Sequence, residues 1–218
     1  MIIGSGGHAR EALDVVEAIN AVAPTYEMVG FLDDDAARVG TTVRGLPVRG
    51  PVEDLFELGD VLYFIGIGNC AGRSRVAQRL HGCAARATTL IHPRASLTAH
   101  CTFGQGALIA AGCVLTNNVT VGDHSHINIG ASVSHDCTIE EFVHLAPGVR
   151  LAGNVTVRRG SEIGIGACVV PGIEVGEHTI VGAGAVVIRS LPARVTAAGV
   201  PARIIRSHSN DSGRERPS

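Results

Sequence analysis

The sequence predicts an α/β unit of the nucleotide-binding type over residues 1–88, followed by a parallel β-helix over residues 89–206. Two observations carry this prediction. The first part alternates short apolar segments with glycine-rich turns and helical patterns, which is typical of a parallel sheet covered by helices. The second part repeats with a period of six residues, which is typical of a stacked coil. The 218 residues are enough for two such domains.

The first unit begins with an apolar segment, Met1–Ile3, that leads into the glycine-rich turn Gly4–His8. A helical pattern follows from about Ala9 to Ala21. A strand of three residues is short against a mean of roughly 5–6, which leaves open whether the chain starts inside a longer strand. Strand, glycine turn and helix in this order are the start of a doubly wound, Rossmann-like unit.

Two further strands are expected in this unit. Met28–Leu32 ends in the aspartates 33–35, and Val61–Ile67 ends in Gly68-Asn69 before a helical stretch over about residues 71–80. A glycine turn at a helix N-terminus suits a phosphate, and an acid at the end of the second strand suits a ribose hydroxyl. The motif is not a strict G-x-G-x-x-G, so plain strand–helix packing stays open. The aspartates also fit a solvated turn, and Asn69 fits a helix cap.

The period of six starts at Ile91. Every sixth residue from there is apolar over seventeen positions: Ile91, Leu97, Phe103, Ile109, Leu115, Val121, Ile127, Val133, Ile139, Leu145, Leu151, Val157, Ile163, Val169, Val175, Val181 and Val187. Four residues after each lies a second, mostly small set: Ala95, Cys101, Ala107, Cys113, Val119, Ser125, Ala131, Cys137, Val143, Val149, Val155, Ser161, Ala167, Ile173, Thr179 and Ala185. This pattern fits neither a helix nor a long alternating strand. It predicts short strands joined by tight turns, with both sets facing the interior of a parallel β-helix.

The cysteines fit the same pattern. Cys101, Cys113 and Cys137 lie in the small set, so we expect them to be buried apolar residues rather than reactive thiols. No two of the six cysteines form a C-x-x-C pair. Reduced thiols and a cytoplasmic location are therefore expected.

Composition excludes several classes of partner. A formal net charge of −2 gives no electrostatic reason to expect nucleic acid or an anionic membrane. No segment approaches the roughly 18 apolar residues of a membrane span. The N-terminus has no basic stretch followed by an apolar run and a small-residue cleavage site, so we expect no secretory signal. The polar tail 207–218 is predicted to be disordered.

Several motifs together resemble one known family. They are Gly4-Ser5-Gly6-Gly7-His8, Phe31-Leu32-Asp33-Asp34, Ile67-Gly68-Asn69, the Ser134-His135-Asp136-Cys137 segment within the hexapeptide repeats, and the closing Gly199-Val200-Pro201-Ala202-Arg203. From about Met1 to Arg206 the chain resembles the hexapeptide-repeat sugar acetyltransferases. This family includes bacterial UDP-4-amino-sugar N-acetyltransferases, GDP-perosamine N-acetyltransferase and sialic acid O-acetyltransferases.

The resemblance implies a left-handed β-helix, a homotrimer with active sites between subunits, a nucleotide sugar on the N-terminal unit and acetyl-CoA on the β-helix. It assigns His135 as the catalytic base, Asp136 at a position where several members have Glu, and Asn128 near the reacting centre. It assigns His144, Gly153 and Ile165 as acetyl-CoA contacts. The nucleotide-sugar site matches Gly6, Gly7, His8, Asp33, Asp34 and Asn69.

The chemistry of acetyl transfer supports a histidine in this role. A sugar ammonium must lose a proton before or during its attack on a thioester, and a neutral histidine is the usual acceptor near pH 7. His135 falls two residues after the inward Val133, on the outward part of a turn, where Asp136 can fix its tautomer. The plain alternative is a solvent-exposed turn histidine. The oxyanion donor can come from turn backbone, which leaves no mark in the sequence.

If a coil takes three hexapeptides, residues eighteen apart stack. His126 and His144 then share one edge, and Asn117, His135 and Gly153 share another, where Gly153 should leave open space beside His135. We expect His124 and His126 to be structural. For His144, plain edge stacking is the alternative to an acetyl-CoA contact.

The sequence therefore predicts an acetyl-CoA-dependent N-acetyltransferase that acts on a nucleotide-linked amino sugar and needs no metal. One alternative is O-acetylation of a sugar hydroxyl, such as that of a sialic acid. Another is a non-catalytic nucleotide-sugar-binding scaffold. A zinc site of the carbonic anhydrase type on this fold uses two histidines five residues apart, and the coil histidines contain no such pair.

Overall fold

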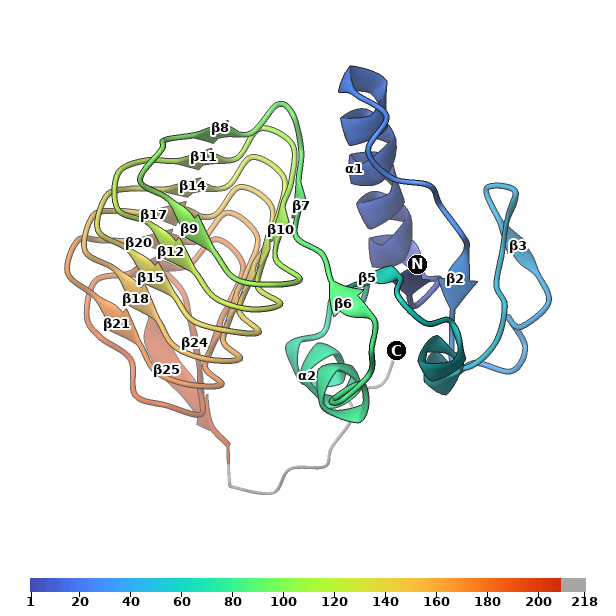
Figure 1. The fold of residues 1–218 in the computed structure, drawn as a ribbon. Helices are drawn as coiled ribbons and strands as arrows, with labels where there is room; N and C mark the ends of the chain where they lie inside the picture. The colour runs from blue at the N-terminus through green and yellow to red at the C-terminus, as the bar shows by residue number, and fades with distance from the viewer. Residues whose placement is uncertain (209–218) are drawn as a thin grey trace.

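A computed structural model describes residues 1–208 of the chain. Figure 1 shows two units side by side, a small α/β unit and a coil of short strands stacked in flat layers. Both predicted parts of the fold class are confirmed: a parallel α/β sheet is followed by a left-handed parallel β-helix. No helix within residues 1–208 is long and apolar enough to cross a membrane.

The sheet of the N-terminal unit has four parallel strands in the order β2–β1–β5–β6. Their bounds are Phe31–Leu32 for β2, Ile2–Ile3 for β1, Leu62–Ile65 for β5 and Arg86–Ala87 for β6. The strands β1, β2 and β5 are shorter than the segments predicted for them, and β6 was not predicted from the sequence. Outside the sheet lie the hairpin of β3 (Thr42–Val43) and β4 (Leu46–Pro47) and the 3-10 helix Val52–Glu57.

Two helices cover this sheet at the predicted places. The helix α1 (Gly7–Val22) follows β1, and α2 (Cys70–Arg79) follows β5. Helix α1 buries an apolar stripe at helical spacing that includes Ala9, Leu13 and Val16. The same apolar cluster contains Leu90 and Leu108 of the β-helix, so the two units share part of one core.

The β-helix has three faces, and almost every strand in it is two residues long. The first face contains β7 (Leu90–Ile91), β10 (Leu108–Ile109), β13 (His126–Ile127), β16 (His144–Leu145), β19 (Glu162–Ile163), β22 (Ile180–Val181) and β24 (Val195–Ala198). The second contains β8 (Ser96–Leu97), β11 (Val114–Leu115), β14 (Ser132–Val133), β17 (Arg150–Leu151), β20 (Cys168–Val169) and β23 (Val186–Val187). The third contains β9 (Thr102–Phe103), β12 (Thr120–Val121), β15 (Thr138–Ile139), β18 (Thr156–Val157) and β21 (Glu174–Val175).

The predicted period is confirmed residue by residue. The second residue of each two-residue strand is a member of the large apolar set, and these residues line the core together with the small set. Strands pair with those eighteen residues on, as in His126↔His144. Buried hydroxyls of the small set bond to backbone, for example Ser125 Oγ to the carbonyl of Glu140 at 2.6 Å. No buried hydroxyl there is left without a partner within residues 1–208.

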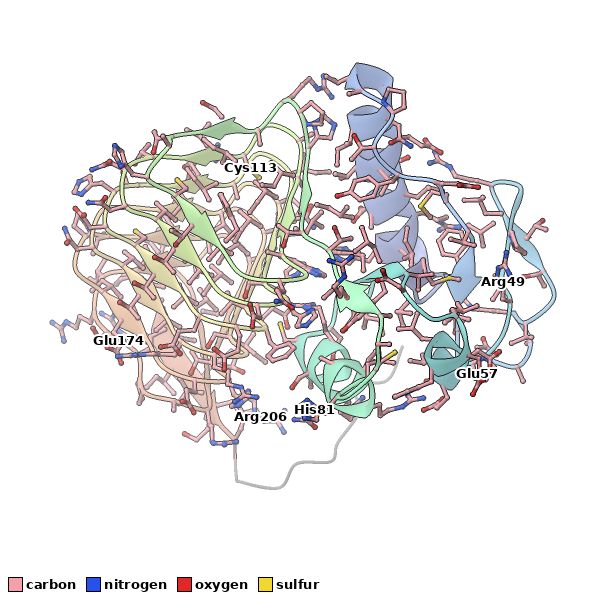
Figure 2. The ribbon with its side chains drawn as sticks, in the orientation of Figure 1. Arg49, Glu57, His81, Cys113, Glu174 and Arg206 are labelled. Carbon is pink, nitrogen blue, oxygen red and sulfur yellow. The ribbon has the colours of Figure 1, made fainter. Side chains whose placement is uncertain are left out.

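The cysteines of the small set pack as predicted. Cys113 and Cys137 are buried and Cys101 packs against the same core. In Figure 2, Cys113 lies inside the coil, whereas Glu174 lies on its outer surface.

The chain ends the coil with an antiparallel hairpin of β24 and β25 (Arg203–Ser207). Ser207 was expected to start the tail but is the last residue of this strand. His208 Nε2 also bonds to Thr196 Oγ1 at 2.8 Å. The rest of the predicted tail, residues 209–218, lies outside the described residues.

Candidate functional site

The predicted nucleotide-sugar residues come from the carboxyl ends of three neighbouring strands. Gly6, Gly7 and His8 follow β1, Asp33 follows β2, and Asn69 follows β5. In a parallel sheet these ends meet at one edge, which is where open α/β sheets bind ligands. His8 packs against Gly68, where an added Cβ would lie 3.6 Å from His8 Cγ.

Ser5 links the glycine turn to the second strand. Its backbone N–H and hydroxyl both donate to Asp33 Oδ2, at 2.8 and 2.5 Å. Arg38 Nη1 donates to Ser5 Oγ at 3.1 Å and lies 4.0 Å from Asp33. Gly6 is the N-cap of α1 and has no side-chain cap, so the first N–H groups of the helix stay available to an anion.

Asp34 and Asn69 are engaged in local structure. Asp34 accepts from Arg79 Nη1 at 2.6 Å and from the backbone of Val52 at 3.1 Å. The hydrogen bond from Arg79 is the main reason that the pKa of Asp34 lies below its ordinary value. Asn69 caps α2 by accepting from the N–H of Gly72 at 2.7 Å. Asn69 thus acts as a helix cap, which was the alternative to its role in the nucleotide-sugar site.

Three imidazoles meet where the two units touch. His8 Nε2 lies 2.8 Å from His126 Nδ1, and the two rings stack with centroids 4.9 Å apart. His144, one coil further on, lies with its ring centroid 5.8 Å from that of His8. Phe64 of β5 stacks on the His126 ring, with the two ring centroids 5.2 Å apart. His126 is fully buried, so its predicted structural character agrees with its position.

These three imidazoles are held in their neutral form. Burial is the largest cause that lowers the pKa of His8, His126 and His144, and the positive charge of Arg73 acts in the same direction on each. The pKa of His144 falls to about 3 and that of His126 well below its ordinary value. At neutral pH these rings are hydrogen-bonding groups and do not carry charge.

His135 lies in a different environment. Its side chain is 55% exposed, and its Nδ1 lies 2.8 Å from Asp136 Oδ2. Asp136 Oδ1 accepts from Asn118 Nδ2 of the preceding coil at 3.0 Å. The bond to His135, followed by that to Asn118, keeps the pKa of Asp136 below its ordinary value. The carboxylate is therefore ionised and accepts a hydrogen bond from the Nδ1–H of His135. This leaves the lone pair on Nε2 free.

The space beside Gly153 is filled, contrary to expectation. A Cβ at that position would lie 2.5 Å from Cε1 and 2.6 Å from Nε2 of His135. The imidazole itself lies over the glycine of the next coil. The open space predicted from the glycine is therefore the seat of the ring.

The remaining predicted residues divide by exposure. Asn128 is buried, and its Oδ1 accepts from the N–H of Ile129 at 2.7 Å. Ile165 is 62% exposed on the edge between the first and second faces. An apolar side chain exposed to this degree is available for contact with a bound molecule.

One chain does not bring His135 and His144 together. His144 lies in β16 on the first face, which the N-terminal unit covers. His135 lies in the turn between β14 and β15, on the edge where the second and third faces meet. In a three-sided coil that edge lies opposite the first face. The two histidines therefore point to opposite sides of the β-helix.

Two hollows of the described chain lie away from the predicted site residues. One of about 270 Å³ is lined by residues that include Glu140 and Arg158, and another of about 220 Å³ by residues that include Tyr26 and Phe64. Neither is lined by a predicted site residue. Within residues 1–208, no group of three or more His, Cys, Asp or Glu is placed to hold a metal ion.

Sequence reasoning missed three polar residues of these clusters. Ser5 and Arg38 contact the glycine turn and Asp33. Arg73 is fully buried between the two units. Ser5 lies inside a motif that the sequence singles out, whereas Arg38 and Arg73 gain their positions from tertiary contacts and carry no local pattern.

Comparison with known proteins gives full-length matches among solved structures. A histidine-to-asparagine variant of perosamine N-acetyltransferase from Caulobacter crescentus, in complex with CoA and GDP-perosamine, is 35% identical. It has a TM-score of 0.87, and the match covers 94% of this chain and 96% of that one. The acetyltransferase domain of PglB from Neisseria gonorrhoeae, in complex with acetyl coenzyme A, is 31% identical with a TM-score of 0.84, covering 94% and 97%.

Sequence comparison gives shorter matches. The family model described as the PglD N-terminal domain matches residues 1–80. UDP-N-acetylbacillosamine N-acetyltransferase of Bacillus subtilis is 41% identical over 115 residues, 50% of each protein. Galactoside O-acetyltransferase of Escherichia coli is 47% identical over 36 residues, 16% of this chain and 18% of that protein. These matches span half or less of the curated relatives.

Proposed function

The chain belongs to the hexapeptide-repeat sugar acetyltransferases, and from that membership we propose that it transfers the acetyl group of acetyl-CoA to the amino group of a nucleotide-linked amino sugar. The observation that carries the proposal is the match over 94% of the chain to an N-acetyltransferase crystallised with CoA and GDP-perosamine. The match to the O-acetyltransferase covers only 36 residues, a length that a shared run of hexapeptide repeats accounts for by itself. N-acetylation is therefore the favoured reaction.

The glycine-turn edge of the N-terminal unit is the proposed site for the nucleotide. The uncapped N-terminus of α1 at Gly6 offers backbone N–H groups to a phosphate. Asp33 is held in place by Ser5 and suits a ribose hydroxyl. His8 and Asn69 border the same edge.

His135 is the proposed general base. With Nδ1–H bonded to Asp136, its Nε2 accepts the proton from the sugar amine as the nitrogen attacks the thioester carbonyl carbon. Collapse of the tetrahedral intermediate breaks the carbon–sulfur bond, and the thiolate takes a proton from the imidazolium. The products are the N-acetylated sugar and free CoA.

The proposed active site takes residues from two subunits of a homotrimer. His135 and His144 point to opposite sides of one β-helix. A neighbouring copy can bring its first face, with His144 and the adjoining His8, toward the edge that carries His135. The exposed Ile165, and the buried Gly153 under the His135 ring, would then border the acetyl-CoA site.

The test is a screen of UDP-, GDP- and dTDP-linked amino sugars with acetyl-CoA, followed by the appearance of free thiol. His135→Ala should lower turnover on the accepted sugar by about 10²–10⁴-fold, the usual contribution of a positioned base. His100→Ala is the matched control, because His100 is exposed and lies outside both clusters. Near-normal turnover of the His135 variant refutes its role.

The same screen separates the alternatives. Thiol release with a sugar hydroxyl but with none of the amino sugars would favour O-acetylation. Binding of a nucleotide sugar without binding of acetyl-CoA would favour the non-catalytic scaffold.

A further inference from the structure

Arg73 of α2 is the largest fully buried side chain of the described molecule, with 0% exposure. Its guanidinium bonds to the backbone of its own unit at the end of β5. Nη1 donates to the carbonyl of Ile67 at 2.8 Å and to that of Gly68 at 3.0 Å. Ile67 and Gly68 follow β5 at the same edge of the sheet as the glycine turn, and Gly68 lies beside His8. Arg73 therefore fixes part of the proposed nucleotide-sugar site.

The same guanidinium bonds to the β-helix. Nε donates to the carbonyl of His124 at 2.6 Å, and Nη2 donates to the carbonyls of Phe142 and Val143 at 3.2 and 3.1 Å. Val143 comes immediately before the strand that carries His144, and His124 comes two residues before His126. One side chain therefore joins two successive coils to the N-terminal unit, and only the planar fork of an arginine supplies this many donors.

The charge of Arg73 has no ion-pair partner among residues 1–208. The thiol of Cys70 lies 3.8 Å away, and Glu162 of β19 acts on the guanidinium at longer range. A buried cation that is compensated only by carbonyls is costly, so its retention needs a reason.

The neighbouring imidazoles supply that reason. Glu11 of α1 lies 3.1 Å from His8 Nδ1 and accepts a hydrogen bond from its N–H. The neutral His8 ring therefore presents Nε2 as an acceptor. His126 Nδ1 then donates to it, which leaves His126 Nε2 as a buried acceptor with no partner within residues 1–208. A proton on any of these rings would meet the Arg73 charge. Burial is the largest cause that lowers the pKa of His124; the charge of Asp123 opposes this, and the charge of Arg73 acts in the same direction as burial.

We infer that Arg73 is a positioning residue, which locks the glycine-turn edge onto the β-helix and fixes His8 and His144 as neighbours between the proposed sugar and acetyl-CoA sites. The kinetic consequence rests on the proposed function. The effect on the histidines does not, because it is a property of the interface.

Two variants separate the geometry of Arg73 from its charge. Arg73→Lys keeps the charge but cannot reach five carbonyls, and Arg73→Met keeps similar bulk without the charge. Arg75→Met is the matched control on the same helix, because Arg75 is exposed and its side chain makes no bond within the described residues. Each protein is followed by imidazole ¹⁵N spectra across pH and by steady-state kinetics with the accepted nucleotide sugar.

Arg73→Lys should lower kcat/KM for the nucleotide sugar on the order of 10²-fold, since misplacement of about 1 Å by a distant change can cost that much. Much of the loss should fall on KM. Arg73→Met should in addition move the titration midpoints of His8 and His144 upward, and by more than Arg73→Lys does, because the lysine keeps the charge while it also loosens the interface. Arg75→Met should do neither.

Wild-type kcat/KM in a folded Arg73→Lys protein overturns the positioning role. Unchanged histidine midpoints in Arg73→Met overturn the electrostatic part. If Arg73→Met does not fold, Arg73→Lys decides alone, with the bond between His8 and His126 read from their ring tautomers. If the wild-type protein lacks acetyltransferase activity, the proposed function fails, whereas the tautomers and midpoints still test the interface.

Discussion

Acid should weaken the fold in a pH range set by the buried histidines. The pKa of His144 lies at about 3 in the folded chain, against an ordinary 6.5. The unfolded chain therefore binds a proton below pH 6.5 that the folded chain refuses. The stabilisation is fully present above pH 6.5, and it is lost as the pH falls from 6.5 toward 3. Over the whole range the difference corresponds to at most about 5 kcal/mol for this one ring.

The measurable part lies between pH 6.5 and 5, above the range where carboxylates such as Asp34 take up protons. Over that interval His144 alone should lower the free energy of unfolding by about 2 kcal/mol, with His8 and His126 adding in the same direction. Urea unfolding at several pH values measures the slope. His144→Gln should lower this slope by the amount that corresponds to the uptake of about one proton on unfolding. His100→Gln, at an exposed position, should leave the slope unchanged. A wild-type slope in His144→Gln would contradict the buried-neutral assignment.

Three further predictions concern the seat of His135. Gly153→Ala should lower turnover at least about tenfold with little loss of stability, because the new Cβ occupies the space of the ring; wild-type kinetics would refute the seat. Asp136→Asn should lower kcat by an order of magnitude or more, since the amide can donate to Nδ1 and reverse the tautomer; an unchanged pH–rate profile would count against it. Asn118→Gly should lower kcat severalfold through loss of the bond to Asp136, whereas Asn154→Gly, at the same left-handed position two coils on, should not; equal effects would exclude the relay.

The β-helix could be predicted in detail because one local rule acts at every coil. Each sixth residue must fill the interior, so burial at Ile127 or Val133 is visible in the sequence without knowledge of any distant contact. Stacking at a spacing of eighteen follows from the same rule, as the pair His126 and His144 shows. The family motifs located the glycine-turn edge in a similarly local way.

The interface between the units could not be predicted in this way. Arg73 sits in a helical pattern as an ordinary polar residue, and its burial depends on carbonyls 51 to 70 positions away in the chain. The prediction of open space beside Gly153 was wrong for a related reason. Sequence spacing gives which residues stack, but the rotamer of His135 decides which of them fills the gap.

The requirements of a general base separate His135 from the other histidines that the sequence singled out. A base near neutral pH must be able to hold a proton and must reach the substrate. His126 and His144 fail the first requirement, because burial and the charge of Arg73 oppose their protonation. His135 is more than half exposed, so it can reach a substrate, and its Nδ1 lies 2.8 Å from Asp136 Oδ2. The neutral His144 can still donate or accept a hydrogen bond at the acetyl group in the proposed reaction, whereas the fully buried His126 bonds to His8. The two clusters therefore have different tasks in one proposed reaction.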